Sequence, residues 1–294
     1  YMQERIFRGK KQICDFTLDD LENVTNTDIE YFLGFLTHYK YGERDHYCNE
    51  RAKARKLSSV RAMFKHFFNK GLISVDNSAK VATPKLHEKP IIRLEQNEVF
   101  DIIDTVESGS GLSPHQRAYH EKNKVRDSAI LMLFLGTGIR ISELVGLNNE
   151  DINFDNNSFI VTRKGGSKSI LYFDSDVAAA LARYIEQKEN LPVSREDSNA
   201  LFLSGRNSRI TVRAVENLVQ KYAKIVSPLK KISPHKLRST YGTQLYKATG
   251  DIYIVADILG HKDVNTTRKH YAAISDDNRR AVAGKVKLIK PDEE

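Results

Sequence analysis

The chain of 294 residues has few residues of several types, and each scarcity argues against a class of protein. Tryptophan is absent, and the two cysteines, Cys14 and Cys48, form no CxxC pair, which argues against a disulfide scaffold and a cysteine-bound zinc site. The longest apolar run, Ala129 to Leu135, is too short to span a bilayer. No signal peptide is visible, although Tyr1 is not a natural start. A soluble cytoplasmic protein is expected, with no membrane contact.

Positive charge is present in excess. Lysine and arginine number 46 against 38 aspartates and glutamates, a formal net charge of +8. Polyanions are natural partners of such a chain, although a solvated basic surface has the same composition. Hydrophobic residues make up 40% of the sequence, which is enough for real cores, and the length favours two domains.

The expected architecture is mainly α-helical, with one small antiparallel sheet in the second part. Residues 1–85 read as helical, 86–92 as a proline-flanked linker, 93–275 as a mixed α+β domain, and 276–294 as a tail with a short amphipathic helix. Gly71 is expected to close a helix over 49–70 as its C′ residue. Further helices are expected at 95–106, 126–135, 175–188, 211–226, 235–248 and 251–259. Strands are expected at 159–161 and 170–173, and a loop at 109–121.

A basic segment lies within the first of these helices. Between residues 51 and 70 it has seven cations and no carboxylate. They are Arg51, Lys53, Arg55, Lys56, Arg61, Lys65 and Lys70. A basic helix face is often only solvated, but so many uncompensated cations favour contact with phosphates. The first six are therefore candidate DNA-binding residues.

The second part of the chain supplies side chains that could hold and attack a phosphate diester. Arginine binds phosphate oxygens bidentately and stays charged, so Arg140, after Gly136-Thr137-Gly138, and Arg238 are candidates for that role. His235 and Arg238, three residues apart, are expected to share a helix face. The alternatives are a structural ion pair between Arg140 and Glu143, and a surface charge at Arg238.

These motifs and their order resemble the tyrosine recombinases, the Xer and phage-integrase family. Residues 90–280 resemble that family's catalytic domain, and the helical first part resembles its core-binding domain. The resemblance implies that Glu143 orients Arg140, and that Lys164, at the tip of a β-hairpin, protonates the departing 5′ oxygen. Lys168 competes with Lys164 for this role, and Arg163 is expected to contact the DNA backbone.

The resemblance also implies the remaining catalytic groups. His235 and His261 would donate to a phosphate oxygen or accept a proton, and Tyr271 would be the nucleophile. One departure stands out. In most relatives the tyrosine follows the second histidine by nine residues, a position held here by His270. Tyr271 is one residue further along and is kept as the nucleophile.

The implied activity is site-specific DNA recombination through a 3′-phosphotyrosyl intermediate and a Holliday junction, without cofactor or metal. The implied partners are duplex DNA with paired half-sites and further copies of the chain, as a dimer on a site and a tetramer in the synapse. An accessory regulatory protein is a candidate partner, and the tail is expected to dock on a neighbouring protomer. The biological role is either Xer-type chromosome dimer resolution or mobile-element integration. A catalytically idle DNA-binding protein and a type IB topoisomerase-like enzyme are the alternatives.

Overall fold

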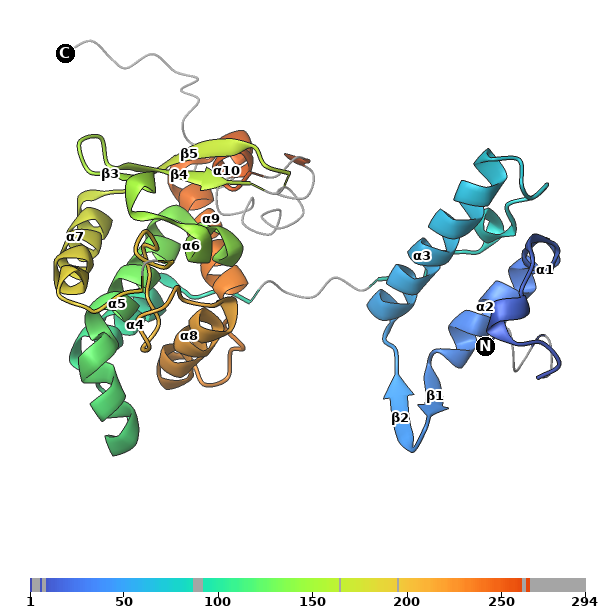
Figure 1. The fold of residues 1–294 in the computed structure, drawn as a ribbon, viewed down its shortest axis with the longest axis horizontal. Coiled ribbons are helices and arrows are strands. Elements are labelled where there is room, and N and C mark those ends of the chain that lie inside the picture. The colour runs from blue at the N-terminus through green and yellow to red at the C-terminus, as the bar shows by residue number, and fades with distance from the viewer. Residues whose placement is uncertain are drawn as a thin grey trace, which may run out of the picture. The chain divides into compact units, whose positions relative to one another are not determined.

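Figure 1 shows the computed structural model, in which the chain divides into two compact units, Tyr1–Pro90 and Ile91–Glu294. The structure describes residues 1, 6, 9–86, 92–163, 165–194, 196–260, 263 and 264. Each unit has a hydrophobic core of its own. The boundary between the units falls within the predicted linker, 86–92.

Three helices share the core of the first unit. The long helix α3 (Glu50–Asn69) contributes Leu57 and Phe64, which are almost completely buried. The shorter helices α1 (Leu18–Glu22) and α2 (Asn26–Phe35) contribute their apolar residues to the same core. This unit also has two 3-10 turns, η2 (Ile13–Asp15) and η3 (Asn77–Lys80).

Capping explains where α3 begins and ends. The side chain of Asn49 accepts a hydrogen bond from the backbone N–H of Ala52 at 3.0 Å. At the other end, Gly71 has φ +66°, a conformation that costs glycine little, and its N–H donates to the Phe68 carbonyl at 2.9 Å. The prediction that Gly71 closes this helix is confirmed.

The first unit also contains a β-hairpin that was not predicted from the sequence. Strands β1 (His38–Tyr41) and β2 (Arg44–Tyr47) pair antiparallel around a turn at Gly42. The rings of His38 and Tyr47 stack across the strands with centroids 4.7 Å apart. The prediction of helix throughout residues 1–85 is wrong here. No residue of either strand is fully buried, and only Tyr39 and His46 are half-buried, so the sequence has no apolar alternation here.

Helix α5 (Pro114–Thr137) forms the centre of the second unit. It packs against α4 (Gln96–Ser108), α7 (Ser175–Glu189) and α9 (Pro234–Thr249), as Figure 1 shows. The other helices in the described part of this unit are α6 (Ile141–Gly146), α8 (Val212–Val226), α10 (Ile252–Ile258) and the 3-10 turn η4 (Asn149–Asp151). The helices predicted at 95–106, 175–188, 211–226, 235–248 and 251–259 are confirmed to within a turn. In the described part of the chain, no helix combines the length and the hydrophobicity needed to cross a bilayer.

The start of α5 corrects a second prediction. Residues 109–121 were expected to form a loop, and the helix was expected to begin at Arg126. The helix instead begins at Pro114, because Ser113 and Gln116 form a reciprocal capping box with distances of 3.3 and 3.0 Å and proline favours the first helical position. Its first turns are mostly polar and exposed, so they have no apolar periodicity. The loop is therefore confined to 109–113.

The sheet of the second unit has three antiparallel strands in the order β3-β4-β5. They are β3 (Ile152–Asn153), β4 (Ser158–Thr162) and β5 (Lys168–Tyr172). The two predicted strand segments are confirmed, and the described residues form two small sheets rather than one. The register places Thr162 opposite Lys168, so the hairpin turn lies between these two residues.

Candidate active site

A close approach of two helices prepares the site. Helix α5 ends at Gly138, which has φ +63°. A Cβ atom on Gly138 would overlap the ring of Tyr241 on α9, so glycine lets α9 lie against this turn. Arg140 follows at the N-cap of α6, and Arg238 on α9 donates to the Gly138 carbonyl. The turn therefore brings the two candidate phosphate-binding arginines to the same place.

Glu143, in the first turn of α6, is the anion of the site. Its side chain is only 3% exposed. The backbone N–H of Arg140 donates to Oε2 at 3.0 Å, and the Arg140 guanidinium donates to Oε1 at 2.8 Å. Burial raises the pKa of Glu143, but these hydrogen bonds and the positive charge of Arg163 outweigh burial, so the net pKa is lowered. Glu143 is therefore a carboxylate at neutral pH that holds the Arg140 guanidinium in place.

A second arginine reaches the same carboxylate from the sheet. Arg163 follows the last residue of β4, and its side chain is 9% exposed. Its Nη1 donates to both carboxylate oxygens of Glu143, at 3.1 and 3.3 Å. Its Nη2 donates to the Ile258 carbonyl at 3.0 Å. The residue expected to contact the DNA backbone is thus turned inward in this structure, because the buried carboxylate and the helix end both attract its guanidinium.

Three successive carbonyls at the end of α10 accept hydrogen bonds from these arginines. Ile258 accepts from Arg163, Leu259 from Arg140 at 2.9 Å and from Arg238, and Gly260 from Arg140 at 2.8 Å. The last carbonyls of a helix have no intrahelical partner and lie at the negative end of its dipole. Cations that bind them therefore stabilise the end of α10.

The two candidate catalytic residues on α9, His235 and Arg238, differ in their exposure to solvent. Arg238 is 5% exposed and donates to the carbonyls of Gly138 and Leu259, whereas His235 lies in the first turn and is exposed. The alternative that Arg238 is only a surface charge is therefore excluded. The three-residue spacing does place both residues on one helix, but the long Arg238 side chain extends into the protein.

Three of the candidate catalytic residues lie outside the described residues: Lys164, His261 and Tyr271. The predicted tail helix also lies outside them. The residues beside Lys164 form a tight turn, in which the N–H of Arg163 donates to the Ser167 carbonyl at 2.7 Å and Gly165 has φ +101°. The competing candidate Lys168 begins β5 and is exposed.

Comparison with known proteins identifies the family. The model of the phage integrase family matches residues 93–278. The chain belongs to this family. Tyrosine recombinase XerS of Streptococcus agalactiae serotype III (strain NEM316) is 31% identical over 297 residues, which cover 92% of this chain and 82% of the relative. Tyrosine recombinase XerC of Thermodesulfovibrio yellowstonii is 31% identical over 218 residues, which cover 73% of this chain and 69% of the relative.

Solved structures show the same fold. XerH site-specific recombinase bound to palindromic difH substrate, in a post-cleavage complex, matches with a TM-score of 0.71 and 17% identity, covering 90% of this chain and 73% of that one. The Tn1549 transposon integrase in complex with circular intermediate DNA matches with a TM-score of 0.68 and 21% identity, covering 95% and 91%. The predicted family, fold class and enzyme class, a tyrosine-type site-specific recombinase, are confirmed.

The basic segment of this phage integrase family member separates into two groups. Four candidate DNA-binding side chains on α3 are exposed: Arg51, Arg55, Lys56 and Lys65. Lys53 instead pairs with Glu50 at 2.9 Å and is 12% exposed. Arg61 donates to the carbonyls of Ser78 and Val81 and to the Thr83 hydroxyl. Arg61 therefore ties α3 to the segment that follows it, whereas Lys53 has an ion-pair partner within α3.

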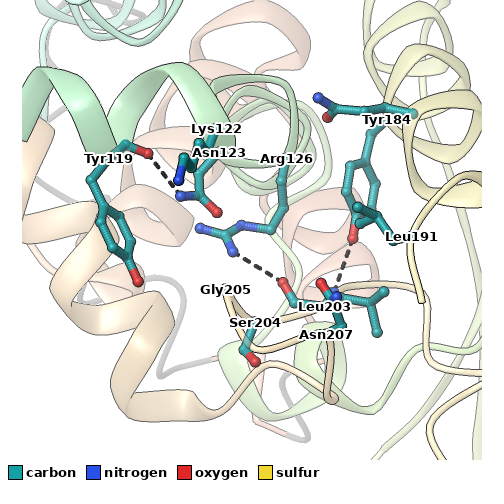
Figure 2. Close-up of a pocket in the computed structure, with 11 residues that line it drawn as sticks. Tyr119, Lys122, Asn123, Arg126, Tyr184, Leu191, Leu203, Ser204, Gly205 and Asn207 are labelled. Atoms are coloured by element: carbon teal, nitrogen blue, oxygen red, sulfur yellow. Dashed lines mark hydrogen bonds between the residues drawn. The ribbon is translucent and has the colours of Figure 1, made fainter. Parts of the chain in front are cut away.

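A pocket elsewhere in this recombinase was not anticipated from the sequence. It has a volume of about 430 Å³ and lies between α5, α7 and the 203–208 turn (Figure 2). Arg126 donates to the Leu203 carbonyl at 3.1 Å and to Asp127, and the Leu203 N–H donates to the Tyr184 hydroxyl at 2.9 Å. Burial raises the pKa of Tyr184 to about 12. These groups bind one another, and the pocket is not lined by Arg140, Glu143, Arg163 or Arg238.

No sequence motif marks the members of this pocket, since Arg126 and Leu203 are far apart in the chain. Among the described residues, no group of three or more histidine, cysteine, aspartate or glutamate side chains could hold a metal ion.

Proposed function

We propose that this recombinase cleaves and rejoins duplex DNA through a 3′-phosphotyrosyl intermediate, with Tyr271 as the nucleophile. The main support is the convergence of Arg140 and Arg238, from two separate helices, on the backbone at Leu259 and Gly260. This backbone leads directly into His261, and Tyr271 follows ten residues later. Arg140 and Arg238, which are distant in sequence, thus lie in one small region, as groups that bind the same phosphate must.

Arg140 has the donors for a phosphate oxygen. A guanidinium has five N–H groups. Within the described residues, the Arg140 guanidinium donates to Glu143, Leu259 and Gly260, and the side chain is 31% exposed. The other N–H groups can stabilise the charge that develops on the non-bridging oxygens in the transition state. Arg238 is proposed to do the same from α9.

The proposed reaction balances without a cofactor. The Tyr271 phenol loses its proton, and its oxygen attacks phosphorus, with His235 and His261 binding the phosphate or taking that proton. The bond between phosphorus and the 5′ oxygen breaks, and Lys164 protonates the leaving oxygen. Rejoining runs in reverse, with a 5′ hydroxyl of the partner strand attacking the phosphotyrosine. The ester conserves the energy of the broken bond, so no ATP is needed.

The proposed partner is duplex DNA with paired half-sites. The exposed cations of α3 supply attraction to phosphates, and binding should weaken steeply with salt. Strand exchange would proceed through a Holliday junction, with a dimer on each site and a tetramer in the synapse. The relatives XerS and XerC favour a Xer-type role such as chromosome dimer resolution, whereas the Tn1549 transposon integrase is the neighbour that favours mobile-element integration.

A nicked suicide DNA substrate tests the proposal. Wild-type protein should form a covalent protein–DNA product, and Tyr271→Phe should form none. Tyr253→Phe is the matched control, because Tyr253 is an exposed tyrosine on α10 close in sequence to the site. Product that persists in Tyr271→Phe would assign the nucleophile to another hydroxyl. DNA binding without any covalent product in the wild type would instead support the catalytically idle DNA-binding protein.

A further inference from the structure

Arg163 connects three parts of the site that are separate in sequence. Its Nη1 binds both oxygens of Glu143, and its Nη2 binds the Ile258 carbonyl at 3.0 Å. It also stands at the base of the β4–β5 hairpin turn, where its backbone N–H donates to Ser167 and its carbonyl accepts from Gly166. A single planar guanidinium therefore links the hairpin, the start of α6 and the end of α10.

The backbone at Gly260 packs directly on this guanidinium. Gly260 has φ +57°, and a Cβ atom there would lie 3.0 Å from Cζ and 3.1 Å from Nε of Arg163. Such distances leave no room for a side chain unless Arg163 shifts. Glycine at 260 therefore allows both the left-handed backbone conformation and the close approach of the Arg163 guanidinium. This contact holds Gly260, the residue before His261, against Arg163.

The charges of the cluster explain why Arg163 stays in place. Glu143 is nearly completely buried, and a buried carboxylate needs hydrogen bonds and opposite charge. Arg140 donates one hydrogen bond to each carboxylate oxygen, and Arg163 adds a further hydrogen bond to each oxygen and a second cation. Moving Arg163 out to a DNA phosphate would therefore break its hydrogen bonds to Glu143 and Ile258 together.

We propose that Arg163 is a positioning residue: by joining Glu143 to the end of α10, it sets the Arg140 guanidinium and the backbone from which His261 continues. This inference rests on the proposed function, because it names a role for Arg163 in the same reaction. The role differs from contact with the DNA backbone. A backbone contact contributes to affinity and its salt dependence, whereas a positioning residue contributes to the rate of the bound complex.

The test compares Arg163→Met and Arg163→Lys with Arg209→Met. Arg209 is the matched control, since its guanidinium also donates to backbone carbonyls, those of Val145 and Leu147, while the ion pairs of Glu143 among the described residues are with Arg140 and Arg163. Three quantities are measured: amide hydrogen exchange at Leu259 and Gly260, the salt dependence of DNA binding in a Tyr271→Phe background, and single-turnover cleavage of the suicide substrate at saturating protein.

For Arg163→Met we expect faster exchange at Leu259 and Gly260, an unchanged salt dependence, and cleavage slowed by about 100-fold, the scale of a small misplacement of reacting groups. Arg163→Lys should be intermediate, because an ammonium retains the charge but loses the planar fork. Arg209→Met should leave exchange at these two amides and cleavage unchanged. The acid limb of the cleavage pH profile should move to higher pH in Arg163→Met alone, since Glu143 loses a cation.

The proposal is overturned if Arg163→Met lowers the salt slope by about one counterion while the saturated complex cleaves at the wild-type rate. Unchanged amide exchange at Leu259 and Gly260 would overturn it as well. If Arg163→Met does not fold, Arg163→Lys decides by the same measurements. If the wild type forms no covalent product, the proposed function is wrong, but the role of Arg163 can still be judged. Amide exchange and the salt dependence of DNA binding test that role without any cleavage.

Discussion

Arginine has different physical roles in the two units. On α3 of the first unit, Arg51 and Arg55 are exposed to solvent. In the second unit, Arg163 and Arg238 are buried and have defined acceptors. Exposed cations attract a polyanion over a distance set by salt and tolerate changes in geometry. Buried guanidiniums depend on the direction of each N–H, so their contribution depends on geometry.

Arg61 shows that a charge run does not decide which role applies. It lies in the same basic segment as Arg55, yet its guanidinium donates to Val81 and Thr83 and ties α3 to the chain that follows η3. Lys53 likewise has a protein partner, because its ammonium pairs with the Glu50 carboxylate. Within one helix, some cations are therefore exposed and others bind protein acceptors, as is also seen between the two units. Substitutions can separate these two roles.

The largest effect is expected from Arg238→Ala. Removing a donor of the proposed transition-state site should lower single-turnover cleavage by about 1000-fold. The carbonyls of Gly138 and Leu259 also lose a cation, so the second unit should melt at a lower temperature. Arg213→Ala on α8 is the control, because that side chain is 75% exposed. Wild-type cleavage by a folded Arg238→Ala protein would contradict a catalytic role.

Glu143→Gln should have the next largest effect, and it should depend on pH. The pKa of Glu143 is lowered in the folded protein, so its carboxylate contributes stability that is present above the unfolded value of 4.5 and is lost as pH falls through the folded pKa. At neutral pH the variant should lose about 3 kcal/mol, since two cations lose a buried partner. Chemical denaturation of wild type and variant between pH 3 and 7 measures this difference.

The stability difference between Glu143→Gln and wild type should shrink toward acid pH. Glu216→Gln provides the control, because that carboxylate is 39% exposed and pairs with the exposed Arg213. A difference that stays constant over the whole pH range would show that the Glu143 charge contributes nothing to folding.

Arg61→Met should destabilise the first unit by about 2 kcal/mol, the scale of losing charged hydrogen bonds to backbone carbonyls. Its DNA binding, measured at a temperature where the protein is folded, should keep the wild-type salt dependence. Arg55→Met should show the reverse pattern. A reduced salt slope in Arg61→Met would mean that this side chain leaves its carbonyl partners when DNA binds.

The smallest effects are expected from single substitutions of the exposed α3 cations. Each of Arg51→Gln, Arg55→Gln, Lys56→Gln and Lys65→Gln should lower the slope of log binding constant against log salt by about one if the side chain contacts a phosphate. Cleavage at saturating protein should not change. Lys53→Gln serves as the comparison, because Glu50 already binds that ammonium. Equal slopes for all variants would place the DNA on another surface.

Much of the fold could be predicted from the sequence because the signals are local. The helix over 50–69 and its end at Gly71 follow from apolar periodicity and from the conformational freedom of glycine. The β1–β2 hairpin and the first turns of α5 could not be predicted this way. The hairpin has no fully buried residue, and the start of α5 depends on a capping box and on burial of His120 against Val106.

By itself, the sequence determined the family, the mainly α-helical fold class and the types of side chain at the candidate site. Residue identities and their order along the chain are sufficient for these three predictions. Only the tertiary structure decided that Arg163 and Arg61 point inward while Arg55 stays exposed. The physical reason is that a guanidinium is drawn to whichever acceptors the fold brings within reach. Glu143 and the carbonyls of 258–260 come from elements that meet only when α6, β4 and α10 are assembled.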